Sequence, residues 1–396
     1  MYSIDIMYIH REAENVITKL LQNKKVLILL GARQVGKTTL LEPFVQAASG
    51  TFLNCDIEVD KSRLLLASTL EPLEAMRLLG NPSLLVIDEA QNLPEVGRIV
   101  KGWYDARVPV KIVLSGSSSL NLLDRTAEPL TGRNEKLYLT PLLFSEILQN
   151  QSWYASQLSR TQLKNHFGKQ IQTLLMQQVV FGGYPETITT DDKEKYLLNL
   201  TSDYLLRDIL QSGLLKSPEP IKRLLALLAH QAGGEVSTNE LANSLSMARP
   251  TVENYIELLE RSYVIFRLHA FGTNQRKEIS KKSKVFFWDT GIRNALLKEF
   301  SLSPLRSDIG SLFESWIIAE VAKRNLMLDG NKSELYFWRN TEGSEVDLII
   351  RGTGILKAYE IKWAKQGMTA STKSFSNTYN IVVEVITKDT FFNLLG

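Results

Sequence analysis

A phosphate-binding loop is the feature that most constrains the fold of this chain. The segment GARQVGKT, from Gly31 to Thr38, has the spacing G-x-x-x-x-G-K-T. It follows an apolar stretch, KVLILL, and precedes a helix-like stretch, TLLEPFVQA. In the strand–loop–helix unit that carries this motif, backbone N–H groups and the helix N-terminus surround the phosphates of a nucleotide. The sequence therefore predicts an α/β domain built around a nucleotide site.

The motif gives its side chains distinct roles. Lys37 places a positive charge on the β- and γ-phosphates, and the Thr38 hydroxyl can ligate Mg²⁺. The other positions expected to contact the nucleotide are Gly31, Ala32, Arg33, Gln34, Val35, Gly36 and Thr39. The expected cofactors are ATP and Mg²⁺.

A second motif, LLVIDEAQ, pairs an apolar strand with two carboxylates, Asp88 and Glu89. Ligands of α/β sheets bind at the carboxyl ends of the strands, where this pair would lie. Asp88 would hold Mg²⁺ through its water shell, and Glu89 would act as general base on the attacking water. The pair therefore favours ATP hydrolysis over binding alone, the alternative being two solvated carboxylates.

Two further candidates for the nucleotide site are less specific. The apolar strand VKIVLSGSSS ends in hydroxyls, so Ser117 (or Ser115) can orient the attacking water, or simply belong to a polar turn. Arg133 lies in a glycine-containing turn before a strand. It can act as a finger on a neighbouring subunit's γ-phosphate or pair with a local carboxylate, and the residues alone favour the carboxylate.

Composition limits the class of protein. A chain of 396 residues is expected to form two or three domains, and its net charge of +3 does not by itself indicate nucleic-acid binding. No apolar run approaches the roughly 20 residues of a membrane helix. A single cysteine, Cys55, excludes an internal disulfide and fits a reducing cytoplasm. We therefore expect a cytoplasmic protein without membrane association.

Hydrophobic periodicity divides the chain into four parts. They are a P-loop ATPase core (1–140), a helical extension (141–216), a winged-helix-like module (217–272) and an α/β C-terminal domain (285–396). The core is expected to have strands at 25–30, 51–56, 84–89, 110–116 and 136–140, with helices at 61–79 and 95–105.

The middle module is read as a helix–turn–helix followed by a β-wing. Ser237 or Thr238 caps the first helix, and the second begins near Thr251. The second helix carries Glu253, Glu257 and Glu260 on its outer face, which disfavours contact with DNA phosphates and favours a protein contact. The better electrostatic contact is the basic cluster that follows, although a solvated linker is an equal alternative. Its members are Arg276, Lys277, Lys281, Lys282 and Lys284.

The C-terminal stretch contains carboxylates and a lysine in the order Glu…Asp…Glu-x-Lys. Glu314 lies on an expected helix, while Asp347, Glu360 and Lys362 lie on expected strands, the last two on the same face. Asp347 and Glu360 would hold Mg²⁺ with Glu314 as a further ligand, and Lys362 would assist the water that attacks a phosphodiester. Amphipathic strands with solvated acid–base pairs are the alternative.

Five segments together resemble a family of bacterial and archaeal AAA-type ATPases. They are GARQVGKTTL, LLVIDEAQNLPEV, IVLSGSSS, LTGRNEKLYLTPLLFSE and GGYPE. Members carry a C-terminal domain long described as of unknown function, assigned to the PD-(D/E)xK nuclease-like, or restriction-endonuclease-like, superfamily. The resemblance implies a sensor role for Ser117 and a nucleotide-sensing role for Arg133, hence a homo-oligomer if Arg133 acts between subunits. Ala32 replaces the proline usual in the family.

Two functions remain open from the sequence. In the first, ATP state governs a Mg²⁺-dependent nuclease acting on nucleic acid. In the second, the chain is a nucleotide-dependent switch whose C-terminal domain is catalytically silent and binds a protein or DNA partner.

Overall fold

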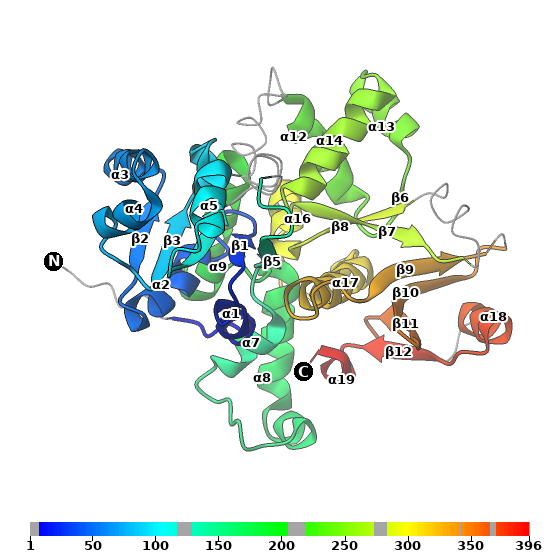
Figure 1. The fold of residues 1–396 in the computed structure, drawn as a ribbon. Helices are drawn as coiled ribbons and strands as arrows, with labels where there is room; N and C mark the ends of the chain where they lie inside the picture. Colours follow the sequence, from blue (N-terminus) through cyan, green and yellow to red (C-terminus); the bar gives the residue numbers. More distant parts are fainter. Residues whose placement is uncertain are drawn as a thin grey trace. The chain divides into compact units, whose positions relative to one another are not determined.

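The computed structural model describes residues 8–116, 129–204, 219–272, 283–340, 342–364 and 370–395. They form two compact units, each with its own β-sheet. The smaller unit spans Arg11–Thr140. The larger unit contains the described residues from Pro141 onward, together with residues 8–10. Figure 1 labels most of the elements of both units.

The smaller unit is built on a parallel five-stranded sheet in the order β2-β3-β4-β1-β5. Its strands are β1 (Val26–Leu30), β2 (Thr51–Asn54), β3 (Leu84–Asp88), β4 (Lys111–Gly116) and β5 (Asn134–Tyr138). All residues of β1 and β3 are buried, as expected for central strands of a parallel sheet that is covered on both faces. The five strands predicted for this region are confirmed, with ends that shift by one to two residues.

One helix precedes β1, and further helices connect β1, β2, β3 and β4 in turn. The helices are α1 (Ala13–Leu21), α2 (Lys37–Ala47), α3 (Glu58–Ser68), α4 (Pro72–Leu78) and α5 (Val96–Asp105), with a short 3₁₀ turn η1 (Ala90–Asn92). The prediction of one helix over 61–79 is wrong, because the chain forms two helices with Pro72 in the first turn of the second. Proline lacks the N–H that a helix interior needs but suits a helix start.

The larger unit begins with helices. Its first helices are α7 (Phe144–Gln149), α8 (Arg160–Phe181), α9 (Pro185–Thr189), α10 (Lys193–Asn199) and the π-helical η3 (Leu200–Tyr204). Then come α12 (Glu219–His230), α13 (Thr238–Leu245) and α14 (Arg249–Arg261). Ser237 caps α13 by accepting a bond from the Glu240 N–H, as one of the two predicted caps. Helix α14 starts two residues before the predicted Thr251, because Pro250 occupies its first turn.

A seven-stranded mixed sheet forms the rest of the larger unit, in the order β12-β11-β10-β9-β7-β8-β6. The strands are β6 (Glu235–Val236), β7 (Ile265–Ala270), β8 (Ser283–Phe287), β9 (Glu334–Arg339), β10 (Glu345–Gly352), β11 (Ile355–Lys362) and β12 (Val383–Thr387). Its helices are α16 (Thr290–Leu297), α17 (Ile309–Met327), α18 (Ala370–Tyr379) and α19 (Phe392–Leu395). Because β7 pairs with both β8 and β9, one sheet joins the stretches 217–272 and 285–396. The four-part division stays a prediction.

The sheet of the larger unit is covered by α17, which packs against β8 and β11. Its buried residues include Phe313, Ile317, Ile318 and Val321, which were predicted to form the packed side of this helix. Among the described helices none is both long and apolar enough to cross a membrane.

The GGYPE segment contains the loop between α8 and α9, as predicted, although its last two residues begin α9, and the loop closes on a buried carboxylate. Gly182 has φ +71°, and a Cβ at this position would overlap the Asp289 carboxylate. The Gly183 N–H donates to Asp289 Oδ2 at 2.7 Å, while Asp289 Oδ1 accepts from the Gly291 N–H at 2.9 Å. Asp289 thereby caps α16 and fastens this helix to the loop.

Substitution of Gly182 tests this packing. Gly182→Ala is expected to lower the free energy of unfolding by about 3 kcal/mol, because alanine is strained at positive φ and displaces a hydrogen-bonded buried carboxylate. Gly168→Ala is the matched control, since a Cβ there meets nothing within 4 Å and the residue lies in α8. Chemical denaturation of both variants checks the prediction, and equal losses of stability would contradict it.

Candidate functional sites

The P-loop lies between the end of β1 and the start of α2, as predicted. Gly36 has φ +90° and precedes the first residue of α2, so this glycine makes the left-handed turn into the helix. The Lys37 ammonium donates to the carbonyls of Gly31 at 3.0 Å and Ala32 at 2.9 Å. These bonds hold the lysine across the loop in which phosphates would bind.

The two predicted Mg²⁺ residues are in direct contact. Thr38 Oγ1 donates to Asp88 Oδ2 at 2.6 Å, which joins the start of α2 to the end of β3. Asp88 is 1% exposed, and its other oxygen, Oδ1, is buried without a hydrogen-bond partner. An unpaired buried carboxylate oxygen is costly unless a ligand or water satisfies it. The donor set of hydroxyl and carboxylate oxygens fits Mg²⁺.

Glu89 follows directly and has an unusual backbone conformation. Its φ is +47°, in the left-handed region that residues other than glycine rarely adopt. Burial raises the pKa of Glu89 above its ordinary value, against the opposing charge of Lys37. The Gln91 side-chain amide donates to Glu89 Oε2. A raised pKa makes a carboxylate a better proton acceptor near neutral pH, and Gln91 is a contact that the motif did not predict.

Of the two predicted sensor serines, Ser117 lies outside the described residues. Ser115 is fully buried in β4, opposite Leu29 of β1, and its hydroxyl has no hydrogen-bond partner. Since β4 lies between β1 and β3, this hydroxyl is placed between the strands that carry the P-loop and Asp88.

Arg133 lies at the opposite edge of the same sheet. Its carbonyl accepts from the Val26 N–H at the amino end of β1, while the P-loop follows the carboxyl end of β1. Five residues of extended strand separate these points by about 16 Å. The guanidinium pairs with Asp105, with Nε 2.7 Å from Oδ1. A pairing with a local carboxylate is therefore what this structure shows.

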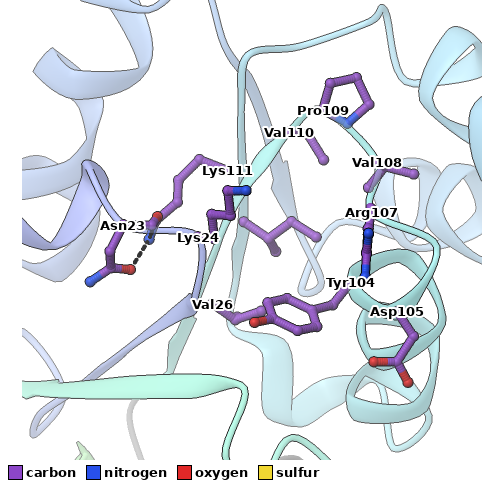
Figure 2. Close-up of a pocket in the computed structure, with 11 residues that line it drawn as sticks. Asn23, Lys24, Val26, Tyr104, Asp105, Arg107, Val108, Pro109, Val110 and Lys111 are labelled. Atoms are coloured by element: carbon purple, nitrogen blue, oxygen red, sulfur yellow. Dashed lines mark hydrogen bonds between the residues drawn. The ribbon is translucent and has the colours of Figure 1, made fainter.

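Asp105 also lines a hollow of about 900 Å³ at this edge (Figure 2). The hollow is bordered by the amino ends of β1 and β4 and by the end of α5. Lys111 donates to the carbonyls of Leu20 and Asn23 at 2.7 and 2.9 Å, and burial lowers its pKa to about 8. This hollow is separate from the P-loop.

In the larger unit, α17 and β10 bring three carboxylates together. Ligand oxygens of Glu314, Glu345 and Asp347 lie within 4.8 Å of one another. Glu314 and Asp347 were predicted as ligands, whereas Glu345 was not. Because alternate residues of a strand share a face, the position of Glu345 two residues before Asp347 was the signal that could have identified it.

The other two members of the predicted quartet lie beside Asp347. Lys362 Nζ is 3.6 Å from Asp347 Oδ2 and 3.2 Å from Glu360 Oε1. The Ile361 N–H donates to Asp347 Oδ2 at 2.7 Å. The structure thus places Lys362 between two carboxylates, but Glu360 is not part of the group formed by Glu314, Glu345 and Asp347. Its role as a metal ligand stays a prediction.

Lys284 enters this cluster from β8. Its side chain is 5% exposed, and Nζ pairs with Glu314 Oε1 at 3.3 Å and with Glu345 Oε1. The expectation that Lys284 belongs to an exposed basic cluster is wrong, because strand alternation turns this side chain toward the carboxylates. The other members of that cluster, Arg276, Lys277, Lys281 and Lys282, lie outside the described residues.

The charged groups of this cluster shift one another's pKa values. Burial and the Asp347 carboxylate raise the pKa of Glu314 to about 7, against the effect of Lys284. Burial also raises the pKa of Asp347, although Lys362 opposes the shift. Burial alone would lower the pKa of Lys284, but Glu314 and Glu345 outweigh it and raise the pKa. Carboxylates crowded in a buried site disfavour one another's ionisation, and a divalent ion bound by their oxygens would favour the ionised forms.

Comparisons with known proteins agree with the geometry of the smaller unit. Residues 23–148 match the AAA domain family. The chain carries an AAA-type P-loop ATPase domain. Residues 172–303 and 309–391 match two families, each described as a domain of unknown function (DUF8612 and DUF4143).

Similar proteins extend beyond the AAA domain. The Walker-type ATPase of Pyrococcus abyssi aligns with a TM-score of 0.51 at 18% identity, over 73% of this chain and 96% of its own, which shows a shared fold. An uncharacterized protein of Mycobacterium tuberculosis is 27% identical over 89% of this chain and 73% of its own length. One of Methanocaldococcus jannaschii is 27% identical over 84% and 74%.

The pKa of Glu314 predicts a pH dependence of stability. The pKa of Glu314 is about 7 in the folded protein, compared with 4.5 for an ordinary glutamate. As the pH rises, Glu314 therefore keeps its proton to a higher pH in the folded state than in the unfolded state. Its contribution to stability is therefore present below pH 4.5 and is lost as the pH rises through about 7. We expect the stability of the wild type relative to Glu314→Gln to fall across this window, measured by urea unfolding. Glu384→Gln, at an exposed position of β12, should show no such trend.

Proposed function

We propose that the AAA domain binds Mg-ATP and hydrolyses it. The observation that carries this proposal is the contact of Thr38 with Asp88, whose second oxygen is buried and unpaired. Lys37 supplies a positive charge to the β- and γ-phosphates, and the backbone from Gly31 to Thr39 supplies N–H donors. When bound, Mg²⁺ neutralises phosphate charge, and Thr38 and Asp88 are the residues that would hold it.

Glu89 is the proposed general base. It adjoins Asp88 at the carboxyl end of β3, and its raised pKa suits it to take a proton from water. Gln91 holds one carboxylate oxygen, which fixes the orientation of the base. A sensor role on β4 fits the buried hydroxyl of Ser115, while Ser117 stays a prediction.

The base assignment is tested by Glu89→Gln. This variant should retain ATP binding and lose about 10²-fold or more in kcat, since only proton transfer is removed. Glu95→Gln, an exposed residue of the same loop region, should leave kcat unchanged. Lys37→Ala should abolish ATP binding. Hydrolysis at the wild-type rate in Glu89→Gln would refute the role of Glu89, and unaltered binding in Lys37→Ala would refute the site.

Arg133 is proposed to act on the nucleotide of a neighbouring subunit. Because the length of β1 separates it from the P-loop of its own chain, it cannot reach that γ-phosphate in cis. An arginine that enters another subunit's site would require the chain to assemble as a homo-oligomer, with release of Arg133 from Asp105.

Specific ATPase activity should then rise with protein concentration. In Arg133→Ala we expect a loss of about 10³-fold in kcat at concentrations where the wild type is assembled. Arg98→Ala, at an exposed position of α5, serves as the control. Activity that is independent of concentration, or equal in Arg133→Ala and the wild type, would contradict action between subunits.

A second activity is proposed for the larger unit, namely a Mg²⁺-dependent nuclease-like site governed by ATP state. It is supported by the oxygen cluster of Glu314, Glu345 and Asp347 with Lys362 beside it. A divalent ion there would supply Lewis-acid activation of water, and it would take over oxygens that Lys284 now pairs with. Lys362 is placed to stabilise charge on a reacting phosphate.

The alternative is a switch whose C-terminal domain only binds a partner. The middle helices α13 and α14 with the β7–β8 hairpin support a winged-helix-like module. Glu253 and Glu257 are exposed on α14, and Glu253 pairs with Arg249 at 2.8 Å. This surface is unfavourable for DNA phosphates and favours a protein partner.

Cleavage assays separate the two functions. Purified protein is incubated with single- and double-stranded DNA and RNA, Mg²⁺ or Mn²⁺, and ATP. We expect metal-dependent cleavage that Asp347→Asn and Glu360→Ala each abolish, while Glu384→Gln retains it. Cleavage that survives both substitutions would refute the site. ATP hydrolysis without cleavage under any metal would favour the switch.

A further inference from the structure

Arg11 is a buried arginine in contact with the P-loop, and no motif singles it out. It is 6% exposed and is the first residue of the smaller unit. Nη1 donates to the Val35 carbonyl at 3.0 Å, and Nη2 donates to the Thr140 carbonyl at 2.7 Å. The guanidinium therefore joins the P-loop to Thr140, which lies two residues after the end of β5.

The contact with Val35 fixes the direction of a peptide group. The Val35–Gly36 peptide is trans, like all described peptides, so its C=O and its N–H point in opposite directions. With the carbonyl of Val35 held by Arg11, the N–H of Gly36 is directed to the other side. In a P-loop this N–H is one of the donors that surround the phosphates.

Arginine suits this task better than lysine. Its planar, permanently charged group presents donors on separate nitrogens in a fixed arrangement, so Nη1 and Nη2 each reach one carbonyl, whereas an ammonium group has a single nitrogen. Bonds from a charged donor are stronger than those between neutral groups. Val35 and Thr140 are themselves buried, which shields these bonds from water.

We propose that Arg11 is a positioning residue for phosphate binding. It holds the Val35–Gly36 peptide with its N–H toward the phosphates, and it braces this peptide against the end of β5. Arg11 contacts no phosphate itself. The inference rests on the proposed ATP binding, and it adds a residue outside the P-loop to that site.

Nucleotide affinity tests this role. In Arg11→Met the Kd for ADP and for ATP should rise about tenfold or more, with KM raised similarly, because the lost charge-assisted bonds no longer orient the loop. The value of kcat at saturation should change less than threefold, since Glu89 and Asp88 are untouched. Arg98→Met, at an exposed position of α5, is the control with unchanged Kd.

A spectroscopic measurement separates positioning from a general loss of structure. In protein labelled with ¹⁵N-glycine, the amide signal of Gly36 should move on addition of ADP in the wild type and move less in Arg11→Met. Signals of Gly102 and Gly132, outside the P-loop, should coincide in the two proteins without nucleotide. A folded Arg11→Met with wild-type Kd and a wild-type shift of Gly36 would overturn the proposal.

If Arg11→Met does not fold, Arg11→Lys provides the same comparison. Lysine keeps the charge but has one nitrogen in place of Nη1 and Nη2 and does not reproduce their two-point arrangement, so its Kd for ADP should also rise, and an unchanged Kd would overturn the proposal. Should the wild type itself bind no nucleotide, the proposed function fails. If the wild type and Arg98→Met bind and the Arg11 variants bind equally well, only the role of Arg11 fails.

Discussion

Parallel pairing of β1, β4 and β3 is the constraint on which the AAA domain depends. It brings three carboxyl strand ends to one edge, so that residues far apart in sequence meet there. Thr38 and Asp88 are 50 positions apart and form a hydrogen bond of 2.6 Å. The same pairing sends the amino ends to the other edge, where Arg133 meets Asp105. Sheet polarity therefore places Thr38 and Asp88 at one end of the strands and Arg133 at the other.

The sequence predicts well those parts of the sites that belong to short local motifs. The P-loop, Asp88 and Glu89 are fixed by a strand and its adjacent turn, so spacing along the chain is enough to place them. The same is true of β11, on which Glu360 and Lys362 lie on one face as alternation requires. Glu345 does not belong to the order Glu…Asp…Glu-x-Lys, although it lies on the same face of β10 as Asp347.

Long-range contacts were not predictable from the pattern. Lys284 follows a run of basic residues and resembles them in sequence, yet it is buried against Glu314 of α17. Only the pairing of β8 with β7, and the packing of α17 on that sheet, brings these residues together. Arg11 is similar, since an arginine beside a helix start is ordinarily exposed. In both cases a buried cation has found oxygen partners, as the high cost of burying unpaired charge demands.

The bonds made by Arg11 have a thermodynamic consequence. Arg11 and Thr140 are the first and last described residues of the smaller unit, and the Arg11 guanidinium joins Thr140 to the P-loop. Binding free energies are reciprocal: if a ligand tightens a connection, then tension on that connection alters the affinity for the ligand by the same factor. If the proposed nucleotide binding stabilises the Arg11 bonds, a partner that breaks them at Thr140 would lower the affinity for nucleotide without touching the nucleotide site.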